Sequence, residues 1–89
     1  TDNRRQRQMC IRDRYNLGVL SIQTAQYQNA VNRFNQIIAI DSSDKRAYLQ
    51  LGISHYYLEN FNLSDSIFKN IKESNDSLLI NELNIFLSN

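Results

Sequence analysis

The chain has 89 residues, of which 42% are hydrophobic and 10% aromatic, and a formal net charge of +1; this length accommodates one small domain with a single core. Two Gly and no Pro disfavour turn-rich β architectures and favour helices joined by short connections. No apolar run approaches the roughly 18 to 20 residues needed to span a bilayer, and a single Cys excludes an internal disulfide.

The first distinctive segment is RRQRQMCIRDR, residues 4–14, which holds five arginines and the only Met and Cys. A basic arm can bind nucleic acid through phosphates, and a basic amphipathic helix can bind a membrane surface. However, no aromatic residue precedes Tyr15, and the apolar residues Met-Cys-Ile are consecutive and form no stripe. A third interpretation is favoured, because residues 4–13 resemble the translation of a transposase adapter used to prepare sequencing libraries. We therefore expect residues 1–14 to be an adapter-derived artefact with its junction, excluded from functional reasoning, and we expect residues 1–13 to contribute little to the fold.

Without that segment the chain is weakly acidic. Residues 15–89 carry five Lys and Arg against seven Asp and Glu, a formal net charge of −2. The charge therefore supplies no evidence for a nucleic-acid partner. With the natural start of the chain expected to be missing, the compartment stays open between cytoplasm and periplasm.

Apolar residues with helical spacing predict two helices, at 15–24 and 28–40. The second carries an amphipathic stripe formed by Ala30, Val31, Phe34, Ile37 and Ile38. The connection between the two helices contains neither Gly nor Pro.

Three further helices are predicted in the second half of the chain. The third begins at a cap formed by Ser43 or Asp44 and runs to about Glu59. The fourth follows a short turn and carries a stripe formed by Leu63, Ile67, Phe68 and Ile71. The fifth spans 78–87 after a cap formed by Asn75 or Asp76, and its apolar residues are Leu79, Ile80, Leu83, Ile85, Phe86 and Leu87.

The chain matches itself at an offset of 34 positions, which indicates an internal repeat. The glycines and small residues at the matched positions are predicted to let paired helices approach closely. The aromatic residues are predicted to fill the space between helices and between units. These repeat positions are Leu17, Gly18, Tyr27, Ala30 and Phe34, followed by Leu51, Gly52, Phe61, Ser64 and Phe68.

Residues 11–78 resemble the tetratricopeptide repeat, whose pattern is Trp-x2-Leu-Gly-x2-Tyr, then Ala-x3-Phe, then Pro. The first unit has Arg14 at the Trp position, which the adapter interpretation explains, and polar capping residues replace both prolines. The resemblance implies an all-α fold, a right-handed helical-repeat solenoid. It would contain two helix-turn-helix units, 15–44 and 45–78, and an additional helix, 79–89, that caps the array or starts a third unit.

Arrays of this family bind extended peptides or partner helices in a concave groove lined by the first helix of each unit. Carried over to this chain, the groove residues are Tyr15, Val19, Ile22, Gln23, Arg46, Leu49, Ile53, Tyr56 and Tyr57. Whether this apolar and aromatic face binds a partner or packs internally is left open.

No catalytic constellation is present from Tyr15 onward, and the lone His55 is expected to pack between helices. We therefore expect no enzyme activity, cofactor, metal or small-molecule substrate. The predicted function is a protein-interaction or scaffold module for a peptide or protein partner, in a fragment of a longer repeat protein. The alternative is an accessory region of a larger enzyme, such as a transferase or sensor kinase, and a structural spacer is a third possibility.

Overall fold

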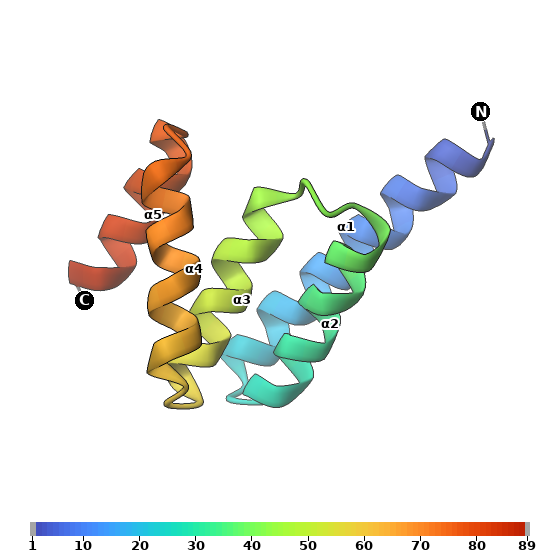
Figure 1. Cartoon of the computed structure of the whole chain (residues 1–89). Coiled ribbons are helices and arrows are strands. Elements are labelled where there is room, and N and C mark those ends of the chain that lie inside the picture. The colour runs from blue at the N-terminus through green and yellow to red at the C-terminus, as the bar shows by residue number, and fades with distance from the viewer. Residues whose placement is uncertain (1, 89) are drawn as a thin grey trace.

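The computed structural model describes residues 2–88, with side chains from Cys10 to Ser88. This part of the chain is all-helical, which confirms the predicted class. Figure 1 shows two antiparallel helix pairs, α1 with α2 and α3 with α4, lying side by side, with α5 next to the second pair. The helices are α1 (Asp2–Gln23), α2 (Tyr27–Ile40), α3 (Lys45–Tyr57), α4 (Phe61–Glu73) and α5 (Ser77–Ser88).

Several helix boundaries differ from those predicted. Helix α1 begins at Asp2 and continues through the arginine-rich segment, because Arg and Gln are good helix formers. Helix α2 begins at Tyr27, and α3 ends at Tyr57 rather than near Glu59. Helix α5 begins at Ser77, so the unit boundary placed after residue 78 falls inside it.

The turns that close the two helix pairs share one geometry. Ala25 and Glu59, 34 positions apart, adopt left-handed backbone conformations with φ of 63° and 66°. In the second turn the N–H of Glu59 donates to the carbonyl of Tyr56 at 3.0 Å, and that of Asn60 donates to the carbonyl of His55 at 2.9 Å. The first turn has the same two hydrogen bonds. Both are Schellman motifs, in which a left-handed residue ends the helix and satisfies its last carbonyls.

Acidic side chains cap the helices that follow each pair. The Asp44 carboxylate accepts a hydrogen bond from the N–H of Ala47 at 3.2 Å. The Asp76 carboxylate accepts one from the N–H of Leu79 at 3.3 Å. Of the two candidates predicted at each position, the aspartates therefore make the capping bonds.

Each glycine lies against the aromatic ring of its paired helix. A Cβ atom on Gly18 would lie 2.5 Å from Cζ of Phe34, and one on Gly52 would lie 2.8 Å from Cε1 of Phe68. Real side chains do not approach this closely, so both predicted close contacts are confirmed.

The small residues on the second helices are also buried as predicted. Ala30 and Ser64 are both 0% exposed. The Ser64 Oγ has no hydrogen-bond partner in the described part of the chain. The hydroxyl therefore adds a desolvation cost that the matched alanine does not have.

Helix α5 corresponds to α3 at an offset of 32 rather than 34. The cap Asp76 corresponds to Asp44, and the buried Leu79 corresponds to Ala47. The shift arises because α4 is one residue shorter than α2, with 13 residues against 14, and the connection before α5 is one residue shorter than that before α3. Helix α5 therefore continues the repeat at its cap and at its buried leucines, which pack with Leu49, Phe68 and Ile71 of the second pair, but it lies less closely against that pair than α3 lies against α2.

Two repeat positions are less buried than predicted. Leu17 is 45% exposed, although its counterpart Leu51 is 7% exposed. Leu51 is covered because it packs into the core that α2 forms, whereas α1 is the first helix and has no such neighbour in the described chain. Phe61 is 50% exposed because it is the first residue of α4 and packs edge-on against Tyr56 at the surface.

Candidate functional site

The residues predicted to line the groove are buried to different degrees. Tyr15, Val19, Ile22 and Ile53 are half-buried, and Gln23 and Arg46 are exposed. Tyr56 and Tyr57 are 42% and 43% exposed, whereas Leu49 is 1% exposed. The accessible part of the predicted groove therefore lies mainly towards the C-terminal ends of α1 and α3.

Leu49 is buried, so at this residue the apolar face packs internally, which is one of the two possibilities that the sequence left open. It belongs to a core cluster with Leu79 and Leu83 of α5. Its counterpart Tyr15 likewise faces the next helix, because its hydroxyl lies 3.4 Å from Nε2 of Gln50 on α3. This repeat position packs against α3 in the first pair and against α5 in the second, and it is buried at Leu49 but only half-buried at Tyr15.

Tyr15 is held at one end of the groove by contacts with two helices. Its ring packs edge-on against Phe34, with centroids 5.7 Å apart, and the Arg46 guanidinium lies 5.3 Å from its centroid. Burial raises the pKa of the Tyr15 phenol above its ordinary value, so the hydroxyl stays protonated at neutral pH. The cation–π contact positions a guanidinium at this end of the groove.

An aromatic cluster occupies the other end of the groove, formed by Tyr27, Tyr56, Tyr57, Phe61 and Phe86. Tyr27 and Tyr57 are stacked, with centroids 4.7 Å apart and ring planes 12° apart. Phe86 of α5 meets Tyr56 and Tyr57 edge-on at 5.3 and 5.9 Å. Aromatic pairs in these geometries are more stable than burial of their surface area alone would make them, and this favours fixed ring orientations. Four helices thus contribute to one preorganised and partly exposed aromatic surface.

A shallow cavity of about 240 Å³ opens on this cluster, lined by Tyr56, Tyr57, Phe86 and Leu87. No charged side chain is among the described residues that line it. Its chemistry suits an apolar or aromatic side chain, with tyrosine hydroxyls available at the surface. Phe86 was missed as a site residue, because the offset of 34 does not align α5 with α3.

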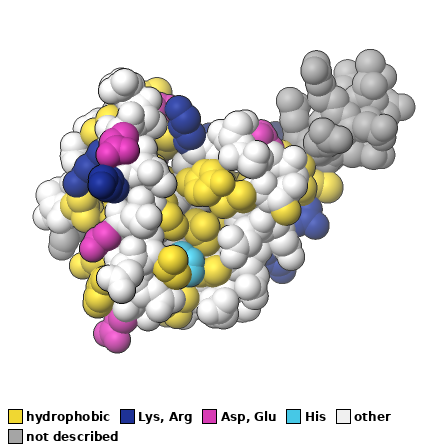
Figure 2. Space-filling view, viewed as in Figure 1, with side chains coloured by type: hydrophobic (Ala, Val, Ile, Leu, Met, Phe, Trp, Pro, Cys, Tyr) yellow, Lys and Arg dark blue, Asp and Glu magenta, His cyan; other side chains and the backbone are white. Residues whose placement is uncertain are grey.

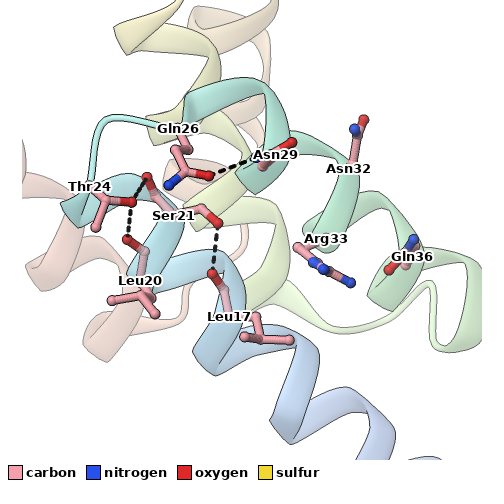
Figure 3. A pocket seen from close by; sticks show the side chains of 9 residues that line it. All are labelled: Leu17, Leu20, Ser21, Thr24, Gln26, Asn29, Asn32, Arg33 and Gln36. Atoms are coloured by element: carbon pink, nitrogen blue, oxygen red, sulfur yellow. Dashed lines mark hydrogen bonds between the residues drawn. The ribbon is translucent and has the colours of Figure 1, made fainter.

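A larger hollow of about 510 Å³, here called the outer hollow, lies on the side of the first pair away from α3 (Figure 3). One wall is apolar and comes from Leu17 and Leu20 of α1. The other wall comes from α2 and is polar, with Arg33 as its charged residue. The full lining is Leu17, Leu20, Ser21, Thr24, Gln26, Asn29, Asn32, Arg33 and Gln36.

Residues on both walls of the outer hollow make side-chain hydrogen bonds. The hydroxyl of Ser21 donates to the Leu17 carbonyl at 2.9 Å, and that of Thr24 donates to the Leu20 carbonyl at 3.0 Å. At one edge, Nε of Arg14 donates to Oε1 of Gln36 at 2.9 Å. The hydroxyls are thereby bonded within their own helix, so the α1 wall presents mainly apolar surface.

A third hollow, of about 370 Å³, lies between the α2–α3 connection and α4. Figure 2 shows hydrophobic side chains gathered between α2 and α4 on this face. The lining is Ser42, Ser43, Lys45, Tyr48, Ile67, Asn70, Ile71 and Ser74. Beside it, Asp41 accepts hydrogen bonds from the N–H and hydroxyl of Ser43, which lower the pKa of the Asp41 carboxyl.

His55 lies near the C-terminal end of α3 and is half-buried. Burial lowers the pKa of its imidazole, and the amide nitrogen of Asn60 lies 3.3 Å from its Nδ1. No group of three potential metal-ligating side chains occurs among the residues that the structure describes. None of the described helices has the length and apolar character needed to cross a membrane.

Comparison of the chain with protein-family models, curated proteins and solved structures gives no match.

Proposed function

We propose that this chain is a tetratricopeptide-type module that binds a segment of a protein partner through the groove on α1 and α3. Two helix pairs with matched glycine contacts and matched turns support the repeat assignment. In this proposal the two pairs form consecutive units of a right-handed solenoid. Helix α5 then occupies the position that the first helix of a third unit would have.

The aromatic cluster carries the binding proposal. Tyr56 and Tyr57 keep more than two fifths of their surface exposed, although ring contacts with Phe86 hold them in place. Exposed aromatic side chains with restricted motion lose little entropy on binding, and they are common energetic anchors of interfaces. An extended peptide lying along the groove would insert an apolar side chain between these rings and pass Arg46 at the other end.

Peptide display provides the test, with the 89-residue chain as bait for a library of linear peptides. We expect peptides that share an apolar or aromatic position to be enriched. For purified peptides, Tyr56→Ala combined with Tyr57→Ala should weaken the dissociation constant at least about tenfold, because each anchor contributes about 1 to 2 kcal/mol.

Leu63→Ala is the matched control, because Leu63 is 54% exposed on α4 and does not line the cavity on the aromatic cluster. It should leave peptide affinity unchanged. Circular dichroism must show native helicity in both variants. Equal binding by the aromatic double variant, or no enriched peptide, would contradict the proposal.

A further inference from the structure

Three aromatic rings stand nearly perpendicular to one another around the cavity on the aromatic cluster. The ring planes of Tyr56 and Tyr57 are inclined at 82°, and those of Tyr56 and Phe86 at 84°. The planes of Tyr57 and Phe86 are inclined at 76°, and the centroids of the three pairs lie 5.3 to 6.0 Å apart. All three rings line the cavity, together with Leu87. The rings are therefore arranged like three walls that meet at a corner, here called the aromatic corner.

Each wall of the aromatic corner is supported by a further ring. Tyr57 packs on Tyr27, Tyr56 packs on Phe61, and Phe86 packs on Phe68. These contacts restrict rotation of the corner rings, although Tyr56 and Tyr57 remain 42% and 43% exposed. A site whose side chains are already held in place loses little conformational entropy when a ligand binds.

The charge distribution around the aromatic corner favours a cation. The face of an aromatic ring carries partial negative charge. Tyr57 is also the last residue of α3, and the C-terminal end of a helix carries partial negative charge. His55 in the last turn of α3 stays neutral at neutral pH, because burial lowers the pKa of its imidazole. No Lys or Arg is among the described residues that line the cavity.

The lining also selects the kind of cation. Neither Asp nor Glu occurs among the described lining residues, so a strongly hydrated primary ammonium would lose water without gaining an ion pair. A trimethylammonium group has no N–H to satisfy and presents methyl groups to the rings. Rings arranged around a quaternary ammonium are the usual form of cation–π recognition. The cavity of about 240 Å³ exceeds the volume of such a group.

We propose that the aromatic corner binds the trimethylammonium group of a trimethylated lysine in the peptide segment that occupies the groove. The source of the group rests on the proposed function, because the peptide brings the lysine to the corner. Recognition of the cation depends on the three rings and on the end of α3. The methyl groups also meet the requirement of this site for apolar surface.

The test compares N-acetyl-trimethyllysine amide with a neutral twin, in which a carbon atom replaces the charged nitrogen. The two probes share shape and apolar surface, so their difference in affinity isolates the charge. Binding to the 89-residue chain is measured by NMR titration of the ring signals of Tyr56, Tyr57 and Phe86. The cationic probe should bind at least about fivefold more tightly than its twin and than unmethylated lysine. Equal affinities, or shifts confined to other residues, would overturn the proposal.

Variants of the chain assign the cation preference to the corner. Tyr56→Leu removes one aromatic wall but keeps an apolar side chain, so it should lower the affinity for the cationic probe towards that for the twin. Affinity for the twin should stay unchanged. Tyr48→Leu is the matched control, because Tyr48 lies on the same helix but lines the third hollow. Circular dichroism must show native helicity in both variants. A full cation preference in Tyr56→Leu would contradict the assignment.

Choline distinguishes a free quaternary ammonium from one carried by a peptide. Trimethyllysine at the apolar position of a display-enriched peptide should bind at least about tenfold more tightly than choline, because the peptide adds contacts along the groove. Equal affinity would overturn the peptide as the source. If the neutral twin binds as tightly as the cation while enriched peptides still bind, the inference fails and the proposed function stands. If no peptide is enriched but the cation preference persists, the proposed function fails together with the peptide source.

Discussion

The ring of Phe34 lies directly against the backbone of Gly18, where an added Cβ atom would approach its Cζ to 2.5 Å. The same relationship joins Phe68 to Gly52 in the second pair. These contacts set how closely the two helices of each pair pack together. The stability of the fold should therefore be sensitive to side-chain size at both glycines.

Gly18→Leu and Gly52→Leu should each lower the free energy of unfolding by about 1 to 3 kcal/mol or more, because a closely packed core cannot take the added volume. Asn16→Leu, on an exposed position of α1, should stay within about 0.5 kcal/mol of the wild type. Urea denaturation measures both. Wild-type midpoints in the two glycine variants would refute the importance of these contacts.

Ser64→Ala should stabilise the protein by about 1 kcal/mol. The substitution removes a buried hydroxyl that lacks a hydrogen-bond partner and introduces a better helix former. The reciprocal change at the matched position, Ala30→Ser, should destabilise by a similar amount. Thermal unfolding of the two variants is the measurement, and shifts in the same direction would contradict this explanation.

Glu59→Gly and Ala25→Gly should each raise the free energy of unfolding by about 1 kcal/mol, because glycine adopts the left-handed conformation without the Cβ conflict. Asn62→Gly, in the first turn of α4, provides the control and should destabilise by about 0.5 to 1 kcal/mol. Chemical denaturation of all three variants distinguishes a turn effect from a general effect of glycine.

Acidification should destabilise the protein partly through His55. Burial lowers the pKa of this imidazole in the folded state, so between the folded and unfolded pKa values the unfolded chain binds more protons. The contribution of His55 to the free energy of unfolding is at its maximum above the ordinary imidazole pKa of about 6.5. It decreases as the pH falls from there through the lower pKa of the folded state. His55→Gln should therefore show a smaller loss of melting temperature between pH 7.5 and 5, measured at about 0.15 M salt. Identical pH profiles would exclude this role.

Deleting residues 1–10 should change the melting temperature by less than about 3 °C. Deleting residues 1–13 should cost more, about 1 kcal/mol, because Ile11 packs against the first core cluster. Within residues 10–13, Ile11 is therefore the residue expected to contribute to the fold.

The adapter interpretation makes a separate prediction. Independent sequencing of the locus should not recover these codons, and recovering them would refute the interpretation.

Much of the local structure could be predicted from the sequence. The apolar spacing identified five helices, and short polar side chains identified the caps Asp44 and Asp76 within one residue. The offset of 34 identified Gly18 and Gly52 as positions of close helix packing. Both positions need glycine because a Cβ atom there would collide with the paired helix. These features depend on interactions within a helix or on residues whose size is limiting, so a single sequence reports them directly.

Exposure and the composition of the aromatic cluster depended on the tertiary structure. Leu17 and Leu51 occupy the same repeat position, yet within the described part of the chain Leu51 is covered by α2 and Leu17 stays 45% exposed. Helix α5 is shifted by two residues from the strict repeat, and that shift puts Leu83 over Leu49 and brings Phe86 to the tyrosines. Periodicity shows which side of a helix is apolar, but the neighbour that covers that side is set by connection lengths and by packing between distant residues.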